Sequence, residues 1–203
     1  MSDKGVLTMK KHPEVTMATK EKIRNSFWQL YCENGISTVS VCQVAKKAGV
    51  NRSTFYQYFI DIYDVLEQIE NSLLDDLTED LKNEINKGLP NSLKDLSVNS
   101  AHIFAKYSDY LVHLLGYNGD PRFSKKLQGV FLPLIKNVIG LDESEQYFEY
   151  IVTFSFSSII NMLTHWYESG QKLTYEELTN VMQSLIATGV LGLTNKKLFK
   201  EQM

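Results

Sequence analysis

The chain has little proline, glycine or cysteine for its 203 residues. Four prolines and 11 glycines argue against a disordered or loop-dominated protein, which would be rich in both. Its two cysteines, Cys32 and Cys42, lie in apolar helical patterns, so we predict buried free thiols in a reducing compartment. With 43% hydrophobic residues, the chain can bury the core of one large domain, or of a small module joined to a larger one.

Signals for secretion or membrane insertion are missing too. Residues 1–15 are polar and contain no apolar run after Lys10 and Lys11, so no signal peptide is expected. Residues 150–167 carry no formal charge, but their six Ser, Thr and Asn side chains are too polar for a lipid core. We therefore predict a buried helix there, no membrane partner and a cytoplasmic protein.

Catalytic and metal-binding motifs are absent as well. The sequence has no Gly-rich phosphate loop, no nucleophile elbow and no close group of carboxylates. His102, His113 and His165 are too scattered in sequence to form a recognisable metal motif. We expect neither an enzyme nor a cofactor or metal site.

What the chain does have is an uneven distribution of charge. Residues 1–60 hold nine Lys and Arg against four Asp and Glu, whereas residues 61–203 hold 12 against 20. A basic N-terminal segment followed by an acidic remainder indicates that the N-terminal segment binds a polyanion such as nucleic acid.

Apolar residues recur at helical spacing almost throughout, and no segment has the alternation of a strand. The sequence therefore predicts an all-α fold of about nine helices, and two of them open with the pattern of a capping box, at Ser40 and Thr174. The N-caps are expected at Thr19, Ser40, Asn51, Asp61 and Thr174. The predicted helices span residues 20–34, 40–48, 52–59, 61–87, 92–115, 121–139 (with a break near Gly129 or Pro133), 144–169 and 174–192.

Residues 40–59 form a predicted helix-turn-helix. Two short helices flank the turn Gly49-Val50-Asn51, where glycine permits a positive φ without strain. In this motif the second helix enters the major groove of DNA with its N-terminal residues at the base edges. Phe55 and Phe59, spaced i and i+4, are expected to point inward and hold that helix.

The second helix offers polar and aromatic side chains to DNA. We assign Arg52, Ser53 and Gln57 to base edges, while most protein–DNA hydrogen bonds go to phosphates. Lys46 is either a phosphate contact or part of a solvated face. Phosphate contacts are expected from Thr38, Ser40, Tyr56 and Tyr58, and the full predicted set also includes Lys46, Asn51 and Thr54.

The segment Ala45-x-x-Ala48-Gly49-Val50-x-x-x-Thr54-Phe55-Tyr56-x-Tyr58-Phe59, followed by a helix containing Leu66, resembles the DNA-binding domain of the TetR family of bacterial regulators. The resemblance covers residues 16–66 and implies an all-α homodimer that binds a palindromic operator. It also implies a DNA-binding domain at residues 16–62 and a C-terminal regulatory and dimerisation domain at residues 63–194. The Tyr63-Asp64 pair and Trp166-Tyr167-x-Ser169-Gly170 further resemble a subgroup that includes the dihydroxyacetone-kinase operon regulator.

The start of the fourth helix departs from this family. The family commonly carries a lysine there, which can meet a phosphate, whereas this chain has Ile60 and Ile62 around Asp61. We therefore expect no phosphate contact from the side chains of this helix, although its backbone N–H groups could serve.

The family usually takes a small-molecule inducer in its C-terminal domain, where this chain has many aromatic residues. Those expected to line a ligand cavity are Tyr107, Tyr110, Phe131, Phe154 and Trp166. Two hypotheses stay open: a repressor released by a small molecule, and a repressor or activator controlled by a partner protein without an inducer. A closed apolar cavity of roughly 300 Å³ or more would favour the first, and a filled core the second.

Dimerisation is expected through the last two predicted helices, at about residues 144–169 and 174–191. One short reading helix makes too few contacts for a unique genomic site, so two half-sites are needed. The helix over residues 61–87 is the candidate to couple an effector to DNA binding, because it begins beside the reading helix and runs into the body.

Overall fold

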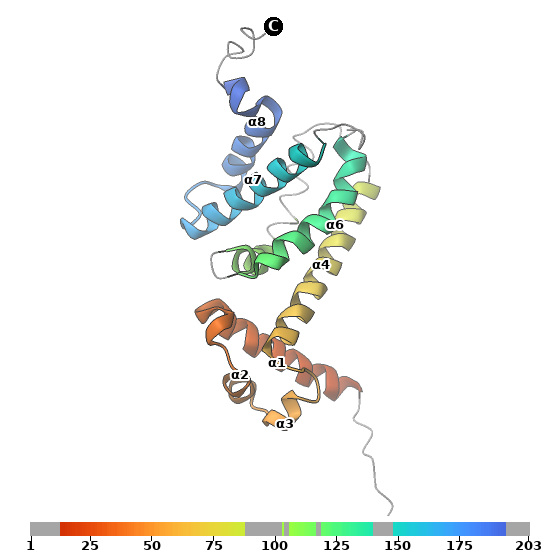
Figure 1. Cartoon of the computed structure of the whole chain (residues 1–203), viewed down its shortest axis with the longest axis vertical. Helices are drawn as coiled ribbons and strands as arrows, with labels where there is room; N and C mark the ends of the chain where they lie inside the picture. Colours follow the sequence, from red (N-terminus) through yellow and green to blue (C-terminus); the bar gives the residue numbers. More distant parts are fainter. Residues whose placement is uncertain (1–12, 88–102, 104–105, 117–118, 140–147, 194–203) are drawn as a thin grey trace, which may run out of the picture. The chain divides into compact units, whose positions relative to one another are not determined.

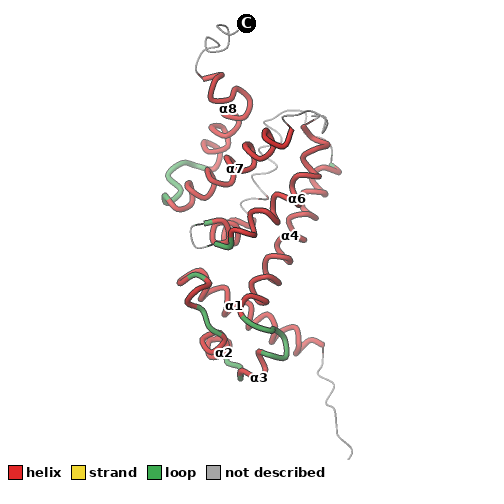
Figure 2. The backbone as a smooth tube through the Cα atoms, in the orientation of Figure 1, coloured by secondary structure: helices red, strands yellow, loops and turns green. Residues whose placement is uncertain are grey.

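The computed structural model describes residues 13–87, 103, 106–116, 119–139 and 148–193. Every regular element among these residues is a helix (Figure 2), so the predicted all-α class is confirmed. The chain divides into two compact units, residues 1–69 and residues 70–203. Within the described ranges, no helix is both long and apolar enough to cross a membrane.

Unit 1, residues 1–69, is a cluster of helices around an apolar core (Figure 1). It contains α1 (Pro13–Asn34), the 3-10 helix η1 (Ile36–Thr38), α2 (Val41–Ala48), α3 (Arg52–Phe55) and the start of α4 (Ile62–Asn86). The side chains of Ile23, Phe27, Val44, Phe55 and Phe59 are all 0–2% exposed. Each such side chain stabilises the unit by about 1.5–3 kcal/mol through burial, and together they fix α2 and α3 against α1.

The helix α1 begins earlier than its sequence pattern suggests. We expected it to start at Lys20 after an N-cap at Thr19, which is wrong: α1 begins at Pro13, and the Thr19 hydroxyl donates within the helix to the Val15 carbonyl at 2.8 Å. Proline suits a first helical position because the N–H it lacks has no partner there. The predicted stop at Gly35 is confirmed by its φ of 72°.

Unit 2, residues 70–203, contains most of α4, a helical segment at residues 106–115, α6 (Pro121–Ile139), α7 (Phe148–Glu168) and α8 (Tyr175–Leu193). Its core residues are apolar side chains drawn from all of these helices. They include Leu73, Leu77, Leu111, Leu114, Phe123, Leu127, Leu163 and Leu178. The predicted capping box at the start of α8 is confirmed, since the Thr174 N–H donates to Glu177 Oε2 at 2.8 Å and the Glu177 N–H donates back to Thr174 Oγ1 at 3.2 Å. Of the helix predicted over residues 92–115, residues 92–102 lie outside the described part of the chain.

The predicted break in α6 is wrong. The helix runs without interruption from Pro121 to Ile139, with Gly129 and Pro133 inside it. An interior proline costs about 3 kcal/mol, because it removes one backbone hydrogen bond and crowds the carbonyl four residues earlier. Here that earlier residue is Gly129, whose backbone adapts readily, and the buried Phe123 and Leu127 hold α6 in place.

Candidate nucleic-acid interface

The N-terminus of α2 is closed by the predicted capping box. The Ser40 N–H donates to Gln43 Oε1 at 2.9 Å, and the Gln43 N–H donates back to Ser40 Oγ at 3.4 Å. The Ser40 hydroxyl also donates to Gln43 Oε1, at 2.6 Å. Nearby, the Thr38 hydroxyl donates to the Asn34 carbonyl at 3.0 Å. Both hydroxyls are exposed, but each must turn away from a protein acceptor before it can donate to a phosphate.

The turn between α2 and α3 depends on Gly49. Its φ of 66° and ψ of 32° place it in the left-handed region, which costs a residue with a Cβ roughly 1–2 kcal/mol. A Cβ added there would meet nothing within 4 Å, so the requirement for glycine is torsional and not steric. The N–H of Val50 then donates to the Ala45 carbonyl at 3.0 Å, which fixes the direction in which the chain enters α3.

The reading helix α3 is shorter than predicted. We expected it to reach Phe59, but it ends at Phe55, and residues 56–58 continue as turns. After Phe55 the backbone hydrogen bonds tighten, since the N–H groups of Gln57 and Tyr58 donate to the carbonyls of Thr54 and Phe55, three residues earlier, at 3.2 and 3.0 Å. The expected side-chain cap from Asn51 is also wrong: the Asn51 side chain makes no cap hydrogen bond, and only its carbonyl serves, accepting from the N–H groups of Thr54 and Phe55 at 2.9 and 3.0 Å.

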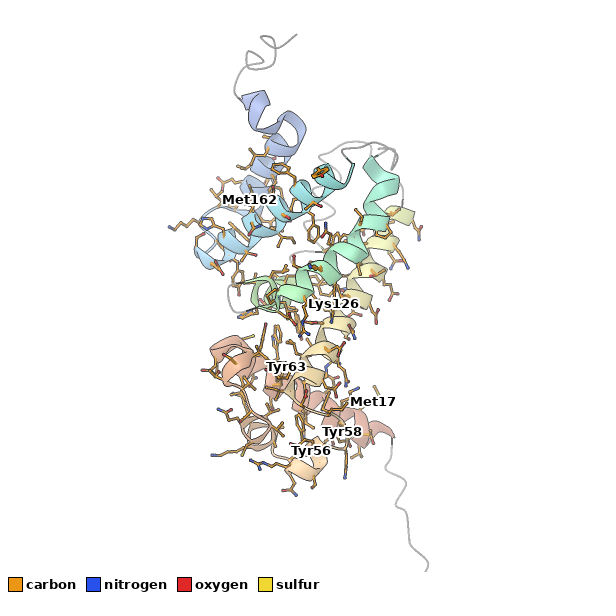
Figure 3. The ribbon with its side chains drawn as sticks, viewed as in Figure 1. Met17, Tyr56, Tyr58, Tyr63, Lys126 and Met162 are labelled. Atoms are coloured by element: carbon orange, nitrogen blue, oxygen red, sulfur yellow. The ribbon has the colours of Figure 1, made fainter. Side chains whose placement is uncertain are left out.

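The side chains predicted to face DNA and those predicted to hold α3 separate as expected. Phe55 and Phe59 are buried, with ring centroids 5.7 Å apart. Tyr56, between them, is 58% exposed, and Tyr58 is half-buried; both flank the reading helix (Figure 3). All ten predicted DNA-binding residues lie between η1 and the turns after α3. Exposed among them are Thr38, Ser40, Lys46, Asn51, Arg52, Ser53, Tyr56 and Gln57, and half-buried are Thr54 and Tyr58.

The cationic side chains near this surface are not equivalent. Lys47 Nζ lies 4.0 Å from Glu33 Oε1 of α1, whereas Lys46 is exposed and has no ion pair with the described residues. The Arg52 guanidinium is hydrogen-bonded to Cys42, and this contact raises the pKa of Arg52 further above its ordinary value. Arg52 therefore stays a cation at the N-terminus of α3.

Both cysteines are free thiols, but the prediction that both are buried is wrong. Cys32 is half-buried and Cys42 is exposed. The buried face of α2 is formed by Val44 and Ala45, and Cys42 lies off that face, near Arg52.

The N-terminus of α4 is occupied by its own carboxylates. Asp61 Oδ1 accepts from the N–H groups of Tyr63 and Asp64 at 2.8 and 2.9 Å, which confirms the predicted cap. Asp64 Oδ2 accepts from the Ile60 N–H at 2.8 Å. These backbone donors are therefore already used, and the two negative charges repel a phosphate. The Ile60 side chain is 80% exposed beside them.

Among the five aromatic residues predicted to line a ligand cavity, three make separate contacts. Tyr107 is buried and its hydroxyl donates to Asp80 Oδ2 at 2.8 Å. The Phe131 ring lies 6.0 Å from the Phe156 ring, and Trp166 Nε1 donates to the Leu173 carbonyl at 2.7 Å. Tyr110 is half-buried and Phe154 is 67% exposed.

A polar groove of about 580 Å³ lies beside the C-terminal half of α4. None of the five aromatic residues lines it. Its lining residues are Asp80, Asn83, Glu84, Asn86, Lys87, Ile103 and Lys106. The described residues contain no group of three or more His, Cys, Asp or Glu side chains that could hold a metal ion.

One charged contact, between α4 and α6, is not predicted by the sequence pattern. Glu70 of α4 is 1% exposed, and its Oε2 accepts from Lys126 Nζ of α6 at 2.8 Å. Figure 3 labels Lys126 on α6. Burial raises the pKa of Glu70 above its ordinary value, and Lys126 partly opposes that rise. The available signal was a glutamate next to Ile69 and three residues before Leu73, on the buried stripe of α4.

Two family models match the chain. The model of bacterial regulatory proteins of the tetR family matches residues 28–69, and that of a transcriptional regulator C-terminal region matches residues 91–188. The chain belongs to the TetR family. TetR-family proteins are DNA-binding transcriptional regulators with a helix-turn-helix, typically repressors and homodimers, and not enzymes. No curated protein matches the chain.

Solved structures share the fold over nearly the whole chain. The fatty acid degradation regulator FadR from Bacillus halodurans has 18% identity and a TM-score of 0.69, covering 89% of this chain and 98% of its own. FadR from Bacillus subtilis, solved with stearoyl-CoA, has 18% identity and a TM-score of 0.66, with coverages of 83% and 98%. The dihydroxyacetone kinase operon activator DhaS has 17% identity and a TM-score of 0.53, with coverages of 86% and 97%. At these identities the similarity concerns the fold alone.

Proposed function

We propose that this TetR-family protein is a repressor that binds a palindromic operator as a homodimer and is released by a small-molecule effector. The observation that carries the DNA-binding part is the exposed polar N-terminus of α3, held from behind by the buried Phe55 and Phe59. Arg52, Ser53 and Gln57 read base edges, because side chains at the start of such a helix reach the major groove. The DNA-binding domain then comprises residues 16–62 and the regulatory domain residues 63–194.

Other predicted residues position the protein on the phosphates. Lys46 supplies an exposed positive charge, and Tyr56 an exposed hydroxyl. Thr38, Ser40 and Tyr58 are assigned to the same role, and Asn51 and Thr54 complete the proposed DNA-binding set. Phosphate contacts of this kind fix register and orientation without carrying sequence information themselves.

Dimerisation through α7 and α8 is supported by exposed apolar side chains on both helices. Tyr150 and Phe154, one turn apart on α7, are 75% and 67% exposed, and Val181 on α8 is 44% exposed. Large apolar side chains gathered on one face mark an interface with another chain. Phe154 is therefore better assigned to the dimer interface than to a ligand cavity. Light scattering should report a dimer at micromolar concentration, and Phe154→Glu should shift it to monomer.

Release by an effector is supported by α4, which starts in unit 1 and ends in unit 2. Its 25 residues span about 38 Å at 1.5 Å per residue. A tilt of this helix would change the distance between the two reading helices of a dimer, which must match about 34–36 Å. The structure of the similar Bacillus subtilis FadR in complex with stearoyl-CoA is consistent with a small-molecule site in unit 2.

The second candidate is a regulator controlled by a partner protein. The observation in its favour is the polar groove beside α4, which is not the closed apolar cavity that an inducer needs. The likeness to the subgroup of the dihydroxyacetone-kinase operon regulator would allow activation in place of repression, since DhaS is named an activator.

The test is selection of bound duplexes from a random-sequence pool by the full-length protein. We expect a palindromic consensus with half-sites one helical turn apart, bound by a dimer. Binding should weaken with salt, with log K falling by about 0.9 per phosphate contacted for each unit of log salt. Recovery of unrelated sequences without two-fold symmetry would contradict the proposal, and transcription from the selected site in vitro separates repression from activation.

A further inference from the structure

Glu70 lies in the apolar stripe of α4 with its carboxylate withdrawn from water. Its neighbours Ile69, Leu73 and Leu74 are buried with it. Lys126 of α6 satisfies Oε2, but Oε1 has no hydrogen-bond partner among the described residues. Buried acceptors are nearly always paired, because an unpaired one has lost its water without compensation. Within the described part of the chain, no donor therefore satisfies this oxygen.

The charges around this carboxylate balance one another. Lys126 pairs with Glu70, and at the start of α6 Arg122 Nη2 lies 2.8 Å from Asp120 Oδ2. Among the described residues, Lys126, Asp120 and Arg122 are the charged groups that act on Glu70. A cationic ligand would leave a net buried charge, and an anionic ligand would face two carboxylates. An uncharged donor preserves the balance at the lowest desolvation cost.

Lys126 can bind a hydrogen-bond acceptor of the same ligand. Its side chain is 35% exposed, and an ammonium group has three N–H donors, of which the described residues use one. An uncharged group that both donates and accepts can bridge the pair: its N–H or O–H reaches Glu70 Oε1, and its oxygen accepts from Lys126 Nζ. Primary amides and alcohols have this combination.

We propose that Glu70 and Lys126 form the polar anchor of an effector site for an uncharged molecule that carries a primary amide or a hydroxyl on an apolar body. This inference rests on the proposed release by a small molecule. The buried Leu73, three residues after Glu70 on α4, and the buried Phe123 and Leu127, near Lys126 on α6, suit an aliphatic body. Because these side chains are already packed, an occupant must displace them, and the displacement acts on α4, the helix that continues from unit 1.

Two probes that differ in one property test the anchor on the full-length protein by titration calorimetry. Hexanamide can donate and accept, whereas N,N-dimethylhexanamide can only accept. The wild type should bind hexanamide about tenfold more tightly or better, since only this amide satisfies Oε1. Glu70→Leu should abolish the preference, and it leaves Lys126 free to extend into water.

The matched control is Asp80→Asn. Asp80 also joins α4 to the next helical segment, through Lys106 Nζ at 2.7 Å, but this pair is more open to water, with side chains 29% and 59% exposed. The preference for hexanamide should survive this change. Lys126→Gln, a second variant, should weaken both amides because it removes the ammonium group that binds their carbonyl oxygens. Circular dichroism melting verifies that each variant is folded.

Three results would overturn the anchor: equal binding of the two amides, a preference that survives Glu70→Leu, or no binding of hexanamide up to its solubility limit. Titration of the wild type with its selected operator duplex runs beside these experiments. Operator binding without an amide preference contradicts the anchor alone. A protein that binds no selected duplex contradicts the proposed function instead.

Discussion

Among the described residues, the buried core of unit 1 is apolar apart from Ser26, whereas the core of unit 2 contains Thr179 and the carboxylate of Glu70. An apolar core specifies a rigid scaffold, and this is what a reading helix of four residues needs to hold its side chains in position. A buried charge stabilises a fold only while its partner is present, and removal of that partner is costly. The difference indicates that the core of unit 1 keeps α3 in one position. In unit 2, the Glu70 carboxylate makes stability depend on the groups around it.

Breaking the core of unit 1 should give the largest effect. Phe55→Ala removes a side chain that is 0% exposed and should lower the free energy of unfolding of this unit by about 3–5 kcal/mol. Urea denaturation measures this change, and binding of the selected operator should be lost with it. The adjacent Tyr56→Ala is the control, since Tyr56 is 58% exposed: it should weaken DNA binding but leave stability nearly unchanged. Similar denaturation midpoints for both variants would contradict this account of the core.

Removing one partner of the charged pair in unit 2 should come next. Lys126→Met leaves Glu70 buried without its counter-ion, at a cost of about 3 kcal/mol near neutral pH. The neighbouring Lys125→Met, on the exposed face of α6, should change stability by about 0.5 kcal/mol or less. The double variant Glu70→Leu with Lys126→Met should recover most of the loss, because a packed apolar pair replaces the ions.

The stability lost in Lys126→Met should be larger at higher pH. Burial raises the pKa of Glu70 in the folded chain, and removal of Lys126, which opposes that rise, raises this pKa further. The folded state then binds more protons than the unfolded state, so stability falls as pH rises from the ordinary pKa of a glutamate through the raised value. Urea denaturation of Lys126→Met should therefore show a smaller loss at pH 5 than at pH 7. An equal loss at both pH values would mean that Glu70 is not the group responsible.

A substitution at the reading surface should affect recognition and not stability. Arg52→Ala removes an exposed cation from the N-terminus of α3, and preference at one base position of each half-site should relax by roughly tenfold. Competition between the operator and single-base variants measures this preference. If affinity falls equally for operator and random DNA, Arg52 positions the protein and does not read a base.

The two lysines of α2 provide a comparison within one helix. Lys46→Ala should weaken binding to all sequences alike and reduce the slope of log K against log salt by about 0.9. Lys47→Ala should change the slope less, because Lys47 already lies near Glu33 of α1. Fluorescence anisotropy at several salt concentrations separates the two, and equal slopes for both variants would remove Lys46 from the set of phosphate contacts.

The smallest expected effect is an increase in DNA affinity. Ile60→Lys places a cation where the side chain is 80% exposed, next to the carboxylates of Asp61 and Asp64. We expect a severalfold rise in affinity for operator and random DNA alike, since a new phosphate contact carries no sequence information. Anisotropy titrations measure both affinities, and Ile60→Gln, which adds no charge, is the control. An unchanged affinity would show that this corner lies away from the phosphates.

The sequence by itself determined the features that depend on neighbours within a few residues. The capping boxes at Ser40 and Thr174, the stop at Gly35 and the Asp61 cap follow from local hydrogen bonding and backbone torsion. The inward pair Phe55 and Phe59 follows from the i, i+4 spacing of the two residues, because the Phe59 N–H still donates to the Phe55 carbonyl at 3.0 Å beyond the end of α3. These local patterns were sufficient to identify the family, because a helix-turn-helix lies within one short segment.

Only the tertiary structure decided the features that depend on packing between distant segments. The α6 helix survives Pro133 because buried residues hold it, and this stabilisation does not appear in local propensity. The contact between Glu70 and Lys126 joins residues 56 positions apart, and no spacing rule links them. Their pairing is decided when α4 and α6 pack together, since only then does burial make an isolated carboxylate costly.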